Sequence, residues 1–191
     1  MTTPIAMEQH AADELRFIRT TMERAVRFDA VPGVGMVLMG SGAVVAYGAT
    51  LLAPDHWLTI WLVTAAAAFI TGVAAMALKA RRGGLSLWSR PAQSFVFTFV
   101  PPLAVGALLT GALAAAGAHL LMPGSWLSLY GIAALTGGAF SVRSVSVMGT
   151  GFLLLGATAL LYPVAGPALM VCGFGVLHVA FGVHIAYRHG G

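Results

Sequence analysis

From Val31 onward, the chain consists of long apolar runs that contain no Asp, Glu, Lys or Arg. A helix needs about 20 residues to cross a bilayer. In hydrocarbon every backbone N–H and C=O must be paired within the protein, so only helices and closed barrels can span it. The runs lack the apolar–polar alternation of barrel strands. The sequence therefore predicts an all-α membrane protein with six transmembrane helices, at about 31–53, 57–78, 93–121, 126–142, 146–163 and 167–187.

The composition argues against the soluble classes of protein. Hydrophobic residues make up 59% of the chain and charged residues only 8%, whereas a soluble domain is about 25% charged. The sequence contains no nucleotide-binding loop, no Ser/His/Asp pattern and no metal-ligand spacing. We therefore expect a protein that is not an enzyme, that binds no nucleic acid and that carries no metal or cofactor. The single cysteine, Cys172, excludes an intrachain disulfide.

The basic residues indicate an orientation in the membrane. With six spans, all ten lie on the same side as the N-terminus, while the opposite loops hold Asp55 and His56 but no Lys or Arg. Cytoplasmic loops carry the excess of Lys and Arg, so we expect both termini in the cytoplasm. The ten are Arg16, Arg19, Arg24, Arg27, Lys79, Arg81, Arg82, Arg90, Arg143 and Arg188.

Residues 1–30 are the charge-rich part of the chain and precede a transmembrane domain at 31–191. Apolar residues recur here at helical spacing, which predicts an amphipathic helix over about residues 6–28. Its four arginines are nearly balanced by five acidic residues, whereas a helix that mainly binds anionic lipid would be more basic. We expect this cytoplasmic helix to lie in the membrane interface, to cover the end of the bundle or to dock a soluble partner.

The chain resembles itself at an offset of 69 residues. Residues 28–65 align without gaps on 97–134, with 14 of 38 positions identical, and a weaker third copy follows at 148–163. The shared text includes a Val-Pro pair and a Pro-x-x-Trp-Leu turn, which ends in Trp57 in the first copy and Trp126 in the second. An indole is stable at the membrane interface. The pattern predicts three tandem hairpins in which Trp57 and Trp126 are interface anchors.

His178 is the residue that we single out as a candidate functional residue. It lies near the centre of the sixth predicted span, and an ionisable residue at membrane depth is a functional candidate by default. It could be a neutral ring hydrogen-bonded across the bundle, a residue on the path of a solute or proton, or a ligand of a metal or haem. We expect it to face the bundle interior. Candidate partners for a hydrogen bond are Thr71, Thr136, Thr150 and Thr158.

Small residues predict where the helices approach closely. Gly175 and Gly182 flank His178 on one helical face, which can therefore press against a neighbouring helix. The segments 42–48 and 131–138 each begin and end with glycine, and we interpret them as packing surfaces in the same way.

Both ends of the chain resemble small bacterial multi-pass membrane proteins to which no activity is assigned. The opening carries ELRFIRTTMERA at 14–25, then Phe28 and AVPG at 30–33. The close carries FGVLHVAFG at 174–182, then Arg188 and two final glycines. The resemblance implies a bacterial cytoplasmic (inner) membrane. The plan of three tandem hairpins is also similar to that of the urea/amide channel family, none of whose sequence motifs occurs here.

Two functions of different classes are compatible with these features. The first is a channel or facilitator for a small neutral solute, formed by the bundle or by a homo-oligomer. The second is a non-transporting sensor or scaffold in the lipid bilayer that acts through its N-terminal helix. A continuous polar path past His178 favours the first, and a dry bundle packed on glycine favours the second.

Overall fold

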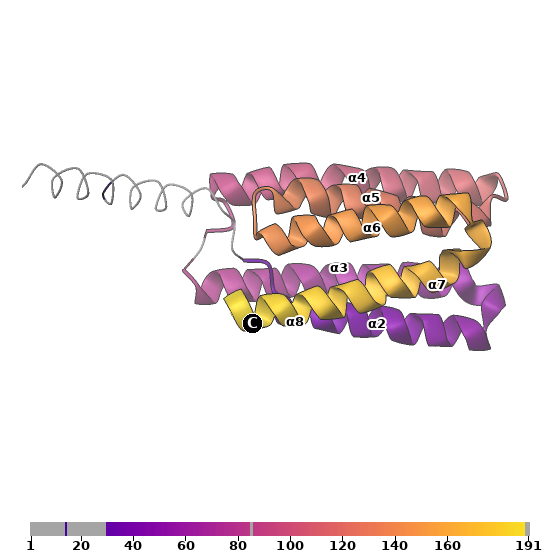
Figure 1. Ribbon diagram of the computed structural model, residues 1–191, viewed down its shortest axis with the longest axis horizontal. Helices are drawn as coiled ribbons and strands as arrows, with labels where there is room; N and C mark the ends of the chain where they lie inside the picture. The colour runs from indigo at the N-terminus through magenta and orange to yellow at the C-terminus, as the bar shows by residue number, and fades with distance from the viewer. Residues whose placement is uncertain (1–13, 15–29, 85, 190–191) are drawn as a thin grey trace, which may run out of the picture.

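The computed structural model describes residues 14, 30–84 and 86–189 of the 191-residue chain (Figure 1). Within these residues it contains six helices that are long and apolar enough to cross a membrane, which confirms the six predicted spans. The predicted amphipathic helix at 6–28 falls outside the described residues, apart from Glu14. The spans are Gly33–Leu52, Pro54–Arg82, Arg90–Ala115, His119–Gly138, Arg143–Leu161 and Pro163–Arg188.

Several of the spans are assembled from more than one helical element. Short 3-10 turns begin the second, fourth and sixth spans, and the sixth also contains a π-helical segment. In chain order the elements are α2 (Gly33–Leu52), η1 (Pro54–His56), α3 (Trp57–Arg82), α4 (Arg90–Ala115), η2 (His119–Leu121), α5 (Met122–Gly138), α6 (Arg143–Leu161), η3 (Pro163–Ala165), α7 (Gly166–Met170), η4 (Val171–Leu177) and α8 (His178–His189).

The two ends of the bundle differ in chemistry. The turns η1, η2 and η3 lie together at one end, which we call the turn end (Figure 1). Proline opens η1 and η3 and stands in the first turn of α5, a position where its missing N–H costs no hydrogen bond. The other end, the basic end, holds the connections around Arg82, Arg90 and Arg143. There Lys79 Nζ donates a hydrogen bond to the Val31 carbonyl (3.0 Å) and joins the ends of α3 and α2.

The helices form two groups of three. In one, α2 packs against α3 and against α8 with η4, and in the other α5 packs against α4 and α6 (Figure 1). Contacts of α6 with α7 and η4 join the groups on one side. On the other side α3 and α4, although consecutive in the chain, make little contact with each other. The described bundle is therefore closed on the side of α6 and weakly joined between α3 and α4.

Glycines form the closest helix contacts. A Cβ on Gly182 of α8 would lie 2.8 Å from the Gly33 carbonyl oxygen of α2, and one on Gly131 of α5 would lie 2.8 Å from the Leu153 nitrogen of α6. The expected packing role of Gly175, Gly182 and the 131–138 segment is thus confirmed. The same interpretation of the 42–48 segment is wrong, because a Cβ on either terminal glycine would meet nothing within 4 Å.

Candidate functional site

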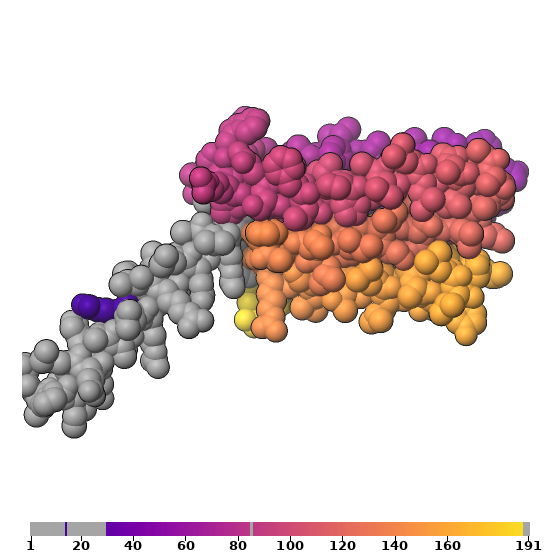
Figure 2. All heavy atoms as spheres, turned by 90° about the horizontal axis from the view of Figure 1, so that it is seen from above, coloured from indigo at the N-terminus to yellow at the C-terminus, as the bar shows by residue number. Residues whose placement is uncertain are grey.

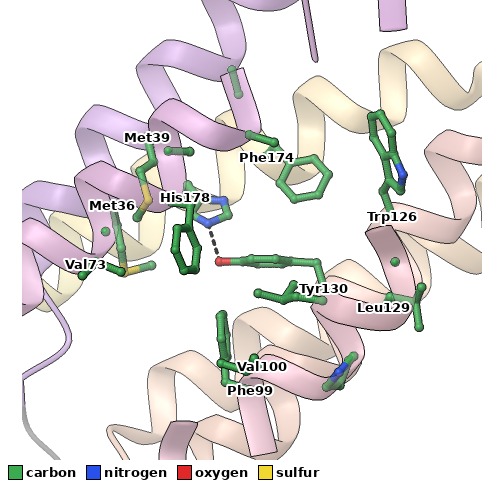
Figure 3. Close-up of a pocket in the computed structure, with 18 of the residues that line it drawn as sticks. Met36, Met39, Val73, Phe99, Val100, Trp126, Leu129, Tyr130, Phe174 and His178 are labelled. Carbon is green, nitrogen blue, oxygen red and sulfur yellow. Dashed lines mark hydrogen bonds between the residues drawn. The ribbon is translucent and has the colours of Figure 1, made fainter. Parts of the chain in front are cut away.

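The two groups of helices enclose a cavity of about 600 Å³. All six spans contribute to its wall, and the lining side chains are overwhelmingly aliphatic, aromatic or methionine. Figure 3 shows Met36 and Met39 of α2 on one side and Phe99 and Val100 of α4 on another. No Asp, Glu, Lys or Arg lines the cavity. Its size is within the range of pockets that enclose a small-molecule ligand.

The cavity is open between α3 and α4. Most of its lining residues are buried or half-buried, and every exposed one belongs to one of these two helices. The wall is therefore interrupted where α3 and α4 fail to pack. The opening is itself apolar, as its residues show: Leu62, Ala65, Phe69 and Val73 of α3, with Val96, Val100 and Ala107 of α4.

His178 lies inside the bundle and takes part in the cavity wall. Its side chain is 3% exposed, and its Nε2 is hydrogen-bonded to the Tyr130 hydroxyl at 2.7 Å (Figure 3). The partner is thus a tyrosine of α5 and not one of the four threonines considered from the sequence. Three of those, Thr136, Thr150 and Thr158, donate to carbonyls of their own helices. The exposed His184, six residues later, is on another face.

The π-helical segment η4 precedes His178 directly. π-helical turns are rare and occur frequently at functional sites. Within η4, Gly173 packs so tightly that a Cβ would lie 2.9 Å from the Phe152 ring, and a Cβ on Gly175 would lie 2.9 Å from Val44. Because η4 is held from both sides without side chains of its own at these points, it brings Phe174 and His178 to the cavity, with ring centroids 6.1 Å apart.

Aromatic rings fix the position of Tyr130. Its centroid lies 4.7 Å from that of Phe152, 5.3 Å from Phe174 and 5.9 Å from Phe99. Figure 3 shows the phenol extending across the cavity toward His178. The sequence analysis did not select Tyr130. The signal that could have revealed it is the repeat, because position 130 is 69 residues after Trp61, and both residues line the cavity.

The other polar groups of the cavity wall are mostly engaged. The hydroxyls of Thr64 and Thr110 donate to the carbonyls of Ile60 (2.8 Å) and Gly106 (2.7 Å) in their own helices. The Trp126 indole donates to the Thr110 hydroxyl oxygen (2.7 Å). Two buried nitrogens of lining residues make no hydrogen bond with the described residues: Trp61 Nε1 and His178 Nδ1.

The two predicted interface anchors contact each other at the turn end. The rings of Trp57 and Trp126 stack with centroids 5.5 Å apart and an interplanar angle of 11°. Both side chains are half-buried, and Trp57 Nε1 is buried without a hydrogen-bond partner among the described residues. The two tryptophans thus lie side by side and join η1 and α3 to α5, in addition to any contact with the interface.

Comparisons and metal geometry give no further assignment. Among the residues that the structure describes, no three His, Cys, Asp or Glu side chains are grouped as metal ligands would be. No family model, no curated protein and no solved structure matches the chain. The site must therefore be interpreted from its chemistry, which is that of a dry, laterally open cavity with a single hydrogen-bonded polar pair on its wall.

Proposed function

We propose that this protein binds a membrane-soluble, largely apolar molecule in the cavity, which the ligand enters from the lipid between α3 and α4. The observation that carries the proposal is the opening, since every exposed lining residue lies on α3 or α4 and all are apolar. In a bilayer, such an opening faces acyl chains. A ligand already dissolved in the membrane can reach the site without crossing water, and burial of its apolar surface against the helices provides the contact area.

This function fits the site better than a channel for a small neutral solute. A pore must supply groups that replace the hydration of its solute. Here the two threonine hydroxyls of the wall donate to their own helices, and no charged residue lines the cavity. The binding function agrees with the second hypothesis from the sequence, a sensor or scaffold whose N-terminal helix docks a soluble partner. Occupation of the cavity would set the separation of α3 and α4.

The proposal places the protein in a bacterial cytoplasmic membrane with its basic end toward the cytoplasm. Support comes from Lys79, Arg82, Arg90, Arg143 and Arg188, which all belong to that end of the described bundle. The excess of Lys and Arg marks the cytoplasmic side. Both termini would then be cytoplasmic, and the turn end would face outward.

The tandem hairpins are part of the same proposal. Three pairs of spans, each joined by a short turn, start from the basic end. Trp57 and Trp126, at equivalent positions of the first two copies, stack on each other at the turn end. Trp61 and Tyr130, also 69 residues apart, both reach the cavity. Duplication of one hairpin would explain why a paired set of aromatic residues surrounds a central site.

Photo-crosslinking tests the binding function. The protein in lipid vesicles is irradiated with an alkyl chain that carries a diazirine, and the adducts are mapped by peptide mass spectrometry. We expect adducts at Met36 and Met148, which line the cavity but are nearly inaccessible from outside. Adducts at Leu154, an exposed residue of α6 outside the cavity wall, serve as the internal control for labelling from bulk lipid.

Two tryptophan substitutions on α3 provide a matched pair. Ala65 lines the opening, whereas Ala66 is equally exposed but does not line the cavity. We expect Ala65→Trp to abolish the adducts at Met36 and Met148 and Ala66→Trp to leave them unchanged. The proposal fails if both methionines stay unlabelled in the native protein, or if an excess of unlabelled alkane does not compete for them. A homo-oligomer sealed through α3 and α4 would give that negative result.

A further inference from the structure

The polar pair in the cavity has more hydrogens than it can use. No charged residue lines the cavity, and a buried ring without a counter-charge is stable in its neutral form. A neutral His178 carries one N–H, and Tyr130 carries one O–H. Their hydrogen bond, Nε2 to the hydroxyl oxygen at 2.7 Å, uses one of these two hydrogens. The other hydrogen must sit either on His178 Nδ1 or on the Tyr130 oxygen.

The surroundings of Nδ1 decide between the two arrangements. His178 Nδ1 is buried and makes no hydrogen bond with the described residues, although the Gly173 carbonyl lies nearby. A buried N–H without an acceptor is costly, and such orphaned donors are rarer than bare acceptors. The favoured arrangement therefore protonates Nε2, which donates to the Tyr130 oxygen. The phenol hydrogen is then left without a partner at the cavity wall.

A second donor beside the cavity is in the same state. Trp61 is 4% exposed and lines the cavity, and its indole N–H finds no acceptor among the described residues. Its ring lies 6.4 Å from Phe174, whose ring is 5.3 Å from Tyr130, so the two donors flank the same phenylalanine. The wall thus has unmatched donors and offers the threonine oxygens only as acceptors already in use. A ligand that complements it brings acceptor oxygens.

We infer that the ligand is a planar carbonyl compound with an apolar tail, of the quinone class, whose carbonyl oxygen accepts a hydrogen bond from Tyr130. This inference rests on the proposed function and adds the headgroup to it. The rings of Phe99, Tyr130 and Phe174 offer faces and edges against which a flat ring packs well. The tail leaves through the apolar opening between α3 and α4. His178 acts through Tyr130, as the residue that positions the phenol.

Competition against the alkyl photo-probe tests this assignment. Three competitors share a decyl chain: decyl-benzoquinone, which only accepts hydrogen bonds, decyl-hydroquinone, which donates them, and decylbenzene, which does neither. Each is titrated against labelling of Met36 and Met148 in lipid vesicles. We expect decyl-benzoquinone to displace the probe at a concentration about tenfold lower than decylbenzene, the effect of one hydrogen bond in a dry site. Decyl-hydroquinone should compete more weakly than the quinone.

Variants separate the headgroup from the cavity. Tyr130→Phe keeps the ring packing and removes the O–H, so we expect it to abolish the advantage of the quinone while the photo-probe still labels both methionines. Retained labelling also shows that the variant is folded. Tyr162→Phe, an exposed tyrosine next to η3, is the matched control and should change nothing.

Each outcome bears on one of the two claims. If the methionines are not labelled at all, the proposed binding function fails. If they are labelled but decyl-benzoquinone competes no better than decylbenzene, or if Tyr130→Phe leaves its advantage intact, the headgroup assignment is overturned. A preference for the hydroquinone would overturn it as well, because it would mean that Tyr130 donates to His178 and offers only lone pairs to the ligand.

Discussion

The glycine contact between α5 and α6 allows a prediction whose magnitude follows from the structure. The two helices share the most extensive interface of the described bundle. A Cβ added at Gly149 would lie 2.8 Å from the Gly131 carbonyl oxygen and 2.9 Å from the Ala134 carbonyl carbon. Ordinary van der Waals contacts of a Cβ are 3.4–4 Å. Because the opposing atoms are backbone, no side chain can rotate away, and the helices must separate.

The expected cost of Gly149→Ala is the difference of two effects. Overpacking typically costs about 1–3 kcal/mol, and a rigid backbone contact belongs near the upper end. Replacing glycine by alanine in a helix returns about 1 kcal/mol. The net loss in the free energy of unfolding is then about 2 kcal/mol. At Gly48, where a Cβ would meet nothing within 4 Å, only the favourable effect operates, so Gly48→Ala should be neutral or more stable by up to about 1 kcal/mol.

Unfolding in mixed micelles measures this difference. Each variant is titrated with SDS in a mild detergent, and helicity is followed by circular dichroism. We expect Gly149→Ala to unfold at a clearly lower SDS fraction than Gly48→Ala, with about 2–3 kcal/mol between them. Equal midpoints for the two variants would refute the packing of α5 on α6 described above.

Three further predictions concern topology and the buried polar groups. In a variant without the native cysteine, we expect Asp55→Cys to react with an impermeant thiol reagent in intact cells and Gly83→Cys to stay unlabelled; labelling at Gly83 would contradict a cytoplasmic basic end. His178→Phe leaves the Tyr130 hydroxyl without a partner and should lower the free energy of unfolding by about 1–3 kcal/mol, whereas an unchanged SDS midpoint would show that the pair adds no stability. Trp126→Phe keeps an aromatic ring at the stack but loses the indole hydrogen bond, so we expect a loss of about 1 kcal/mol in the same titration.

The sequence predicts the spans well because their signal is the absence of charge over a bilayer-sized length. The bounds are less accurate at the fourth span, predicted at 126–142 and found at His119–Gly138. There, proline at position 123 stands within the first turn of α5 and does not end the preceding structure. Residues 139–142 form the connection to α6 instead.

The candidate site was predictable only in part. His178 is conspicuous because it is polar in an apolar span, and its burial follows from the cost of a polar ring in lipid. Tyr130 is not conspicuous, since tyrosine is common in membrane helices. In a membrane protein the residues that face lipid and those that face the core are both apolar, so hydrophobic periodicity does not show which face of a helix is buried. For the same reason Gly48 and Gly149 look alike in the sequence, and a cavity cannot be inferred from it.

A density map of the protein in a lipid nanodisc tests the central claim most directly. The account predicts that α3 and α4 stay apart and that elongated density enters between them and ends beside Tyr130 and His178. A map in which α3 packs against α4 along its length, and in which the space around Tyr130 is filled by side chains, would contradict it.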